Sequence, residues 1–330
     1  MANVFEVKDL CIYLKEKNRR IPGVEHISFT INKEETLGII GESGSGKSLT
    51  CSAVLGLLNP KIWDVSGEVL LNGEPVPYWD NAAMSIFRGN RIALIMQNPM
   101  SAFNPMITIE KHFYETINKL GTNIQPKKTV DKIARDMLSR MRIRDPQAVL
   151  KSYAFQLSGG MLQRIMIALS LVMKPNILIA DEPTTALDLT IQHEIIELLN
   201  ELQKSTGTGI LVVSHDLGVI AHLATHVAVM HSGSFVEKGC ANAVLTAPSH
   251  PYTKGLFASK PGFSKKRLSV LQGQPPTLEN RRSGCTFLQR CSFADDNCLK
   301  YDLAPFLVSP THEMQCSKIT EMEEKCNVAT

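Results

Sequence analysis

Residues 41–48 read Gly-Glu-Ser-Gly-Ser-Gly-Lys-Ser and fit the pattern G-x-x-x-x-G-K-[ST]. The apolar stretch 37–40 before them predicts a buried strand, and residues 49–58 after them have helical character. In such a strand–loop–helix unit, glycines let backbone amides approach phosphate oxygens, and the helix N-terminus adds partial positive charge. We expect a nucleotide phosphate site made of Gly41, Glu42, Ser43, Gly44, Ser45, Gly46, Lys47, Ser48 and Leu49. Lys47 is expected to reach the β- and γ-phosphates, and the Ser48 hydroxyl to bind Mg²⁺.

A second stretch that could take part in catalysis lies at 177–182, where four apolar residues precede Asp181 and Glu182. A short, wholly apolar run predicts a central parallel strand, and α/β sheets place their ligands at the carboxyl ends of such strands. Asp181 is expected to hold Mg²⁺ through water. Glu182 is expected to act as the catalytic base that polarises the attacking water.

Residues 157–163 read Leu-Ser-Gly-Gly-Met-Leu-Gln. Ser158, Gly159 and Gly160 predict a tight turn at which a helix starts with its free amides pointing outward, which makes an anion site without a lysine. A chain with one full phosphate site and one such half-site is expected to form a dimer, in which each half-site completes the nucleotide site of the partner.

At this point the chain resembles the ATP-binding-cassette (ABC) ATPases, whose signature is LSGGQ. The resemblance implies that four residues of the signature stretch contact the nucleotide: Ser158, Gly159, Gly160 and Gln163. It also implies that Gln97 senses Mg²⁺ and the γ-phosphate, so that Ser48, Gln97 and Asp181 form the Mg²⁺ set. His215 resembles the switch histidine that contacts the γ-phosphate, and residues 186–188 resemble the D-loop.

One element departs from the family pattern. These ATPases usually stack the adenine on an aromatic residue, and Leu14 occupies that position here, next to Tyr13. Neighbouring residues of a strand face opposite sides. Tyr13 is therefore a candidate adenine contact rather than a direct match.

Several stretches resemble the dipeptide, oligopeptide and nickel importer ATPases more closely than the general family. They are residues 38–48, 98–105, 181–188 and 250–253. Residues 96–105 and 159–164 look most like the nickel and metal-chelate (metallophore) branch. The resemblance implies an ATPase subunit that couples Mg-ATP hydrolysis to uptake of a nickel or metal chelate, with a di/oligopeptide importer as the alternative.

The 330 residues favour two units. Alternating strands and helices favour an α/β core. With the resemblance, we expect a P-loop NTPase (ABC ATPase) core with an antiparallel β subdomain and a helical subdomain, plus a small Cys-rich C-terminal extension. The expected domains are a cassette at 1–258, with its helical subdomain at about 99–165, and a linker with the Cys-rich extension at 259–330.

The composition limits the possible partners. A net charge of +3 does not favour nucleic acid as a partner. The most apolar stretch, 165–173, is far shorter than the roughly 20 residues of a spanning helix, and the N-terminus has no secretory signal. The resemblance implies a peripheral protein on the cytoplasmic face of the inner membrane. Its implied partners are a second, non-identical ATPase, two permease subunits and an extracytoplasmic solute-binding protein. Met100, Phe103 and Met106 are expected to form an apolar surface for a permease helix.

Five of the 8 cysteines lie within the last 46 residues. Without a secretory signal, a metal site is favoured over disulfides. The spacing of Cys285, Cys291, Cys298 and Cys316 resembles the C-terminal extension of peptide-importer ATPases. We expect these thiols to hold a [4Fe–4S] cluster, with zinc or free thiols as alternatives, while Cys326 lies outside the set.

Two other classes stay open from the residues alone. One is a soluble ABC ATPase that acts on nucleic acid or ribosomes, and the other is a small-molecule kinase with a phosphate loop. A single cassette without a heptad run disfavours the first. The signature stretch 157–163 and His215 have no role in the second.

Overall fold

The computed structural model describes residues 3–16, 19–77, 80–119, 124–184, 188–260, 271–278, 284–299 and 305–316. The chain forms two compact units. Unit 1 comprises Met1–Phe5, Thr30–Thr36 and Leu70–Val213, and unit 2 comprises Glu6–Phe29, Leu37–Val69 and Ser214–Thr330. Each unit therefore contains segments from distant parts of the sequence.

Three parallel strands form the centre of unit 1: β6 (Ile92–Ile95), β7 (Ile177–Asp181) and β8 (Gly209–Val213). Ile95 pairs with Ala180, and Asp181 pairs with Val213, so the three strands end at the same edge. Their residues are almost all buried, as the apolar runs predict.

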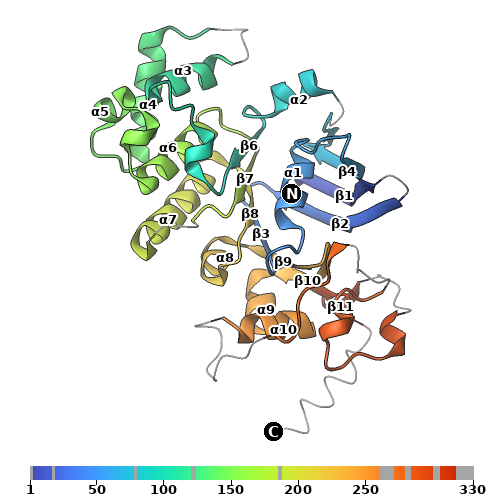
Figure 1. Ribbon diagram of the computed structural model, residues 1–330. Helices are drawn as coiled ribbons and strands as arrows, with labels where there is room; N and C mark the ends of the chain where they lie inside the picture. Colours follow the sequence, from blue (N-terminus) through green and yellow to red (C-terminus); the bar gives the residue numbers. More distant parts are fainter. Residues whose placement is uncertain are drawn as a thin grey trace. The chain divides into compact units, whose positions relative to one another are not determined.

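Helices α6 (Gly159–Leu171) and α7 (Leu189–Thr206) belong to the same unit. Helices α3 (Ile109–Asn118), α4 (Lys127–Arg140) and α5 (Pro146–Lys151) form a group within the stretch where the sequence predicts a helical insertion (Figure 1). They bury an apolar stripe that includes Phe113, Val130 and Leu138. Smaller elements are β5 (Glu74–Pro75), α2 (Asn81–Phe87), η1 (Pro99–Ala102) and η2 (Ala154–Gln156).

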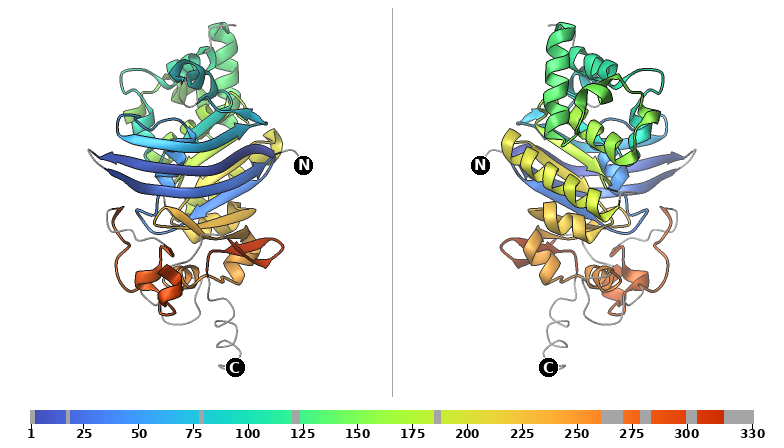
Figure 2. Two further views of the ribbon diagram at one scale, coloured as in Figure 1. Left: turned by 90° about the vertical axis from the view of Figure 1, so that its right-hand side faces the viewer. Right: turned by 90° about the vertical axis from the view of Figure 1, so that its left-hand side faces the viewer.

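The long strands β1 (Asn3–Glu16) and β2 (Arg19–Asn32) run side by side in a sheet with β4 (Trp63–Leu71) (Figure 2). Most of their residues belong to unit 2. The same unit contains β3 (Thr36–Ile40), which pairs in parallel with β9 (His226–His231). Helix α1 (Lys47–Val54) follows β3 along the chain. Unit 2 thus combines one parallel strand pair with antiparallel strands.

Strand β9 pairs antiparallel with β10 (Ser234–Cys240), and α8 (Leu217–Leu223), α9 (Ala241–Thr246) and α10 (Pro251–Ala258) complete this part of unit 2. The segment after α10 contains the 3-10 turns η4 (Leu288–Arg290) and η5 (Asp296–Leu299), and strands β11 (Phe306–Ser309) and β12 (His312–Met314).

The expectation of a separate Cys-rich C-terminal extension is not supported. Strand β12 pairs antiparallel with β10, with Glu237 opposite Met314. Phe287 is buried, and its ring lies 5.4 Å from that of Tyr252 in α10. The segment is too short for a core of its own, so it uses the core of unit 2.

The α/β fold with a phosphate loop is confirmed, whereas the domain boundaries at 258 and at about 99–165 stay predictions. None of the helices in the described part of the chain could span a bilayer. The 18-residue helix α7, for example, carries Glu194, Glu197, Glu201 and Lys204.

We predict that Phe287→Ala lowers the free energy of unfolding by about 3–5 kcal/mol, because it leaves a cavity in the core of unit 2. Phe293→Ala is the matched control, since this ring in the same segment is 38% exposed. Urea unfolding monitored by circular dichroism measures both variants. Equal midpoints for Phe287→Ala and Phe293→Ala would show that the segment folds apart from unit 2.

Candidate functional site

The loop between β3 and α1 has the geometry of a phosphate cradle. Gly46 has φ 106°, a left-handed conformation that favours glycine. A Cβ at Gly41 would lie only 2.2 Å from the carbonyl oxygen of Met230, so that this position accepts no side chain. The buried Lys47 donates from Nζ to the carbonyl oxygens of Gly41 (2.9 Å) and Glu42 (2.8 Å). The loop therefore curls around its own ammonium group, while the Ser48 side chain lies at the exposed start of α1.

The second residue of this loop is fixed by two other segments of unit 2. The Glu42 carboxylate accepts hydrogen bonds from both terminal nitrogens of Arg290, at 2.6 and 3.0 Å. The Glu42 backbone N–H donates to the Tyr252 hydroxyl at 2.9 Å. The sequence predicts neither contact, because Arg290 lies 248 positions from Glu42 and belongs to no motif, and Tyr252 stands in the family stretch 250–253 without an assigned role.

The acidic residues lie at the carboxyl end of β7 in unit 1, as the sequence predicts. Asp181 is the last residue of the strand, and Glu182 follows with φ 53°, a conformation that is uncommon for a residue other than glycine. The Glu182 backbone N–H donates to the carbonyl oxygen of Val213 at 2.9 Å, which fixes this turn against the end of β8. Gln97 is exposed two residues after the end of the neighbouring strand β6. The carboxamide and both carboxylates thus follow adjacent parallel strands.

The signature residues lie at the start of α6, also in unit 1. Ser158 caps the helix and accepts the backbone N–H of Met161 at 3.4 Å. Gly160 is buried, and a Cβ there would lie 3.0 Å from Ile191 in α7. Gln163 is buried as well and donates from Nε2 to the Pro183 carbonyl oxygen at 2.5 Å. Its amide therefore ties α6 to the acidic turn, and its contact with a nucleotide stays a prediction.

The predicted switch histidine, His215, is exposed in unit 2. It lies next to Asp216, which caps α8 by accepting the Gly218 backbone N–H at 2.7 Å. Tyr13 is half-buried, with the Arg20 guanidinium 5.1 Å from its ring centroid, and burial is the main cause that raises its pKa.

Of the predicted D-loop at 186–188, Asp188 caps α7, while residues 185–187 lie outside the described residues.

The prediction of an apolar docking surface is wrong for Phe103. Phe103 is buried and packs edge-on against the His112 ring at 5.2 Å, so it offers no area to a partner. Met100 and Met106 are exposed, as expected. An aromatic residue close to a turn is ambiguous in the sequence, because its burial depends on the helix that follows.

The four cysteines of the predicted cluster are free thiols in unit 2. Burial, with smaller contributions from the charges of Cys316, Cys298 and Cys291, raises the pKa of Cys285 to about 12, so the four thiols are electrostatic neighbours. A metal must displace the proton of such a thiol. Among the described residues, no three of these sulfur atoms lie within 4.8 Å of one another. Cys326 is not described.

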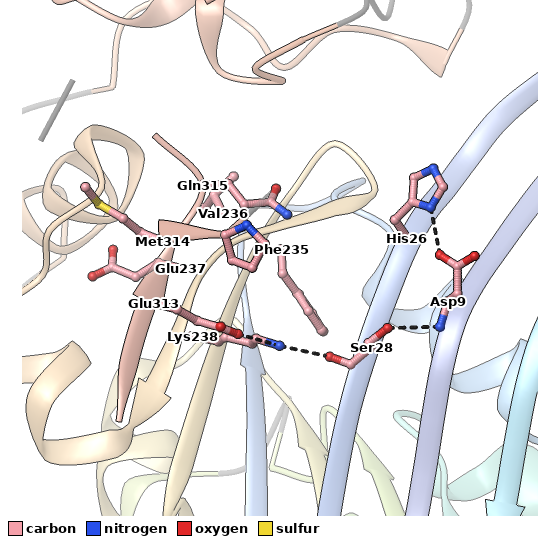
Figure 3. A pocket seen from close by; sticks show the side chains of 11 residues that line it. Asp9, His26, Ser28, Phe235, Val236, Glu237, Lys238, Glu313, Met314 and Gln315 are labelled. Atoms are coloured by element: carbon pink, nitrogen blue, oxygen red, sulfur yellow. Dashed lines mark hydrogen bonds and ion pairs between the residues drawn. The ribbon is translucent and has the colours of Figure 1, made fainter. Parts of the chain in front are cut away.

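A pocket of about 270 Å³ opens elsewhere in unit 2, between strands β1 and β2 on one side and strands β10 and β12 on the other (Figure 3). Its polar groups are paired with one another: His26 with Asp9 at 2.7 Å, and Lys238 with the Ser28 carbonyl oxygen at 3.3 Å. The Cys11 sulfur accepts the backbone N–H of His26 at 3.3 Å, so Asp9, Cys11 and His26 tie β1 to β2. No residue of 41–49 lines this pocket, which is therefore distinct from the phosphate loop.

The chain is similar to known proteins along nearly its full length. Residues 24–185 match the ABC transporter family model, and residues 236–298 match the model of the oligopeptide/dipeptide transporter C-terminal region. The chain is 39% identical to the dipeptide transport ATP-binding protein DppD of Bacillus subtilis, over 96% of this chain and 95% of that protein. It is 37% identical to DppD of Escherichia coli, over 95% and 96% of the two chains.

Solved structures show the same fold. A dimeric ATP-binding cassette in a post-hydrolysis state, bound to ADP and Pi, matches with a TM-score of 0.64 and 24% identity, over 72% of this chain and 98% of that one. The cbiO1 protein of Clostridium perfringens, part of an ABC transporter complex, matches with a TM-score of 0.63 and 25% identity, over 75% and 92% of the two chains.

One buried histidine at the start of α10 predicts a pH dependence of stability. His250 caps α10, and its Nδ1 accepts the Tyr252 backbone N–H at 3.1 Å. Burial lowers its pKa to about 4, below the value of about 6.5 in the unfolded chain. The unfolded chain therefore binds this proton first as the pH falls. The stabilisation is complete above pH 6.5 and is lost between about pH 6.5 and 4, by roughly 3 kcal/mol.

His250→Asn retains a capping side chain and removes the titration. We predict that the difference in free energy of unfolding between wild type and this variant changes by roughly 3 kcal/mol between pH 7 and 4. His222→Asn is the control, because its ring is exposed on α8. Chemical unfolding at a series of pH values measures this. Parallel pH profiles for wild type and His250→Asn would contradict the prediction.

Proposed function

Because this chain belongs to the family of ABC transporter ATP-binding subunits that includes the dipeptide and oligopeptide transport proteins, we propose that it drives the import of di- or oligopeptides. ATP hydrolysis coupled to transport is the activity of the family. The observation that carries the peptide assignment is the identity of 39% over 96% of the chain to a dipeptide transport protein. The match of residues 236–298 to the oligopeptide/dipeptide C-terminal region supports it independently.

This proposal replaces the nickel and metal-chelate interpretation. That interpretation depended on a few residues in 96–105 and 159–164. Relatives that match nearly the full chain include proteins named for dipeptide and oligopeptide transport, among them an oligopeptide transport ATP-binding protein of Bacillus subtilis at 39% identity. The alternative of a peptide importer is therefore the better one.

The proposed catalytic cycle uses the site residues that the sequence predicts. The amides of residues 43–48 and the Lys47 ammonium bind the triphosphate. Oxygen ligands suit Mg²⁺: the Ser48 hydroxyl and the Gln97 carboxamide would bind it, and the Asp181 carboxylate would hold it through water. Glu182 accepts a proton from the attacking water, while His215 donates to the γ-phosphate. Ser158 and Gly160 cap the γ-phosphate held by a partner ATPase, so that ATP binding closes the dimer and hydrolysis reopens it.

ABC importer ATPase subunits act together with transmembrane permeases. For this chain we propose a peripheral position on the cytoplasmic face of the inner membrane, a second ATPase subunit and an extracytoplasmic solute-binding protein. The exposed side chains of Met100 and Met106 offer apolar area for a permease helix.

We predict that Glu182→Gln in the assembled transporter retains ATP binding but lowers ATP turnover at least about 100-fold, since a general base typically contributes that much. Dipeptide uptake is lost with it, and the ATP-bound dimer accumulates. Phosphate release and size-exclusion chromatography in ATP measure this. Glu197→Gln, a change on the exposed face of α7, is the control. Normal turnover in Glu182→Gln would refute its role as the base.

For the four cysteines, we propose a [4Fe–4S] cluster. Tetrahedral zinc at about 2.3 Å from sulfur needs thiolates about 3.8 Å apart, and among the described residues no three of these sulfur atoms lie within 4.8 Å of one another, which disfavours zinc. A cluster binds each thiolate to a different iron and so tolerates wider spacing. Bound there, it would supply a redox-active or structural centre. Cys285, Cys291, Cys298 and Cys316 would each contribute one thiolate.

We predict that the anaerobically purified protein contains about four iron atoms and sulfide per chain. Cys291→Ser should lower the iron content and the visible absorbance. The control Cys240→Ser, which changes a cysteine outside the set, should leave both unchanged. Zinc at one atom per chain without iron would replace the cluster with the zinc alternative, and neither metal would leave free thiols.

A further inference from the structure

Arg290 is a nearly fully buried cation that belongs to no predicted motif. Its side chain is only 3% exposed. Burying a guanidinium is costly unless a carboxylate and hydrogen-bond acceptors replace the lost water. Glu42 supplies the carboxylate through two hydrogen bonds, at 2.6 and 3.0 Å. The Gln272 carbonyl oxygen accepts a third hydrogen bond from Arg290 Nε at 3.0 Å.

Aromatic side chains hold Arg290 in this position. Its guanidinium lies 5.6 Å from the ring centroid of Phe287. Phe287 in turn packs edge-on against His231 at 5.4 Å, and His231 lies 4.5 Å from Tyr252. The His231 Nδ1 also forms a hydrogen bond with the Thr286 hydroxyl at 3.0 Å. Through Phe287, Arg290 is thus packed against the end of β9 and against α10.

The pairing acts on the phosphate loop in two ways. It fixes the position of Glu42, whose own carbonyl oxygen accepts a hydrogen bond from Lys47. It also neutralises a carboxylate that is only 26% exposed, at the second position of a loop built to bind anions. An unpaired carboxylate there would repel a triphosphate, because screening by water is weak at a half-buried site.

We infer that Arg290 is a positioning residue for ATP binding, which braces Glu42 and cancels its charge. The inference depends on the proposed nucleotide site at 41–48. Arg290 itself does not touch the phosphates. The segment that carries three of the four cysteines therefore also sets the geometry and charge of the phosphate loop.

Arg290→Gln keeps the length of the side chain and removes the charge. We expect the KM for Mg-ATP of the assembled transporter to rise about tenfold, while kcat at saturating ATP changes less than threefold. Adding Glu42→Gln to Arg290→Gln removes the carboxylate that has lost its arginine partner. The double variant should therefore recover most of the lost affinity for Mg-ATP. Arg91→Gln is the matched control, because Arg91 pairs with Glu74 on the exposed surface.

The outcome distinguishes positioning from a purely structural role. If Arg290 only stabilised the fold, the second substitution would not restore affinity. An unchanged KM in Arg290→Gln, or no recovery in the double variant, would overturn the inference. Lys47→Ala tests the nucleotide site separately. If this variant loses ATP binding while Arg290→Gln retains it fully, only the role of Arg290 fails, and if Lys47→Ala binds ATP normally, the proposed site itself fails.

Discussion

Buried parallel strands restrict where this chain can place charge. Strands β6 and β7 carry apolar side chains along their length, and a carboxylate inside them would be desolvated without a partner. Polar groups therefore come only where each strand ends, at Gln97 and Asp181. The same holds in unit 2, where the wholly buried β3 leads directly into the phosphate loop. The polar side chains lie at the strand ends because the interior of the sheet is apolar. The catalytic candidates Gln97, Glu182 and His215 accordingly each follow the end of a strand.

This constraint explains why much of the site could be predicted from the sequence. The phosphate loop, the acidic turn and the signature helix are continuous stretches, and their residue types follow from local geometry. Gln163 shows the limit of such reasoning, since the structure buries its amide against Pro183. Phe103 shows it too, because this ring is buried and packs against His112, which lies nine positions further along the chain. Burial depends on contacts between distant residues, which no local pattern encodes.

The C-terminal segment differs most from its prediction. The sequence presents it as a cysteine-rich extension, because its composition changes after residue 258 and its cysteines are concentrated. In the structure, β12 joins β10, and Arg290 reaches Glu42 across 248 positions. A single arginine carries no motif, so this contact could not be predicted. It ties the segment to the loop at 41–48 within unit 2.

Import of peptides is tested most directly by comparing two substrates in the same membranes. Vesicles that contain the chain with its permeases and solute-binding protein are given ATP and either a labelled dipeptide or a labelled nickel chelate. We predict ATP-dependent accumulation of the dipeptide, absent from vesicles that lack the chain, and no accumulation of the nickel chelate. Accumulation of the nickel chelate without the dipeptide would contradict the account.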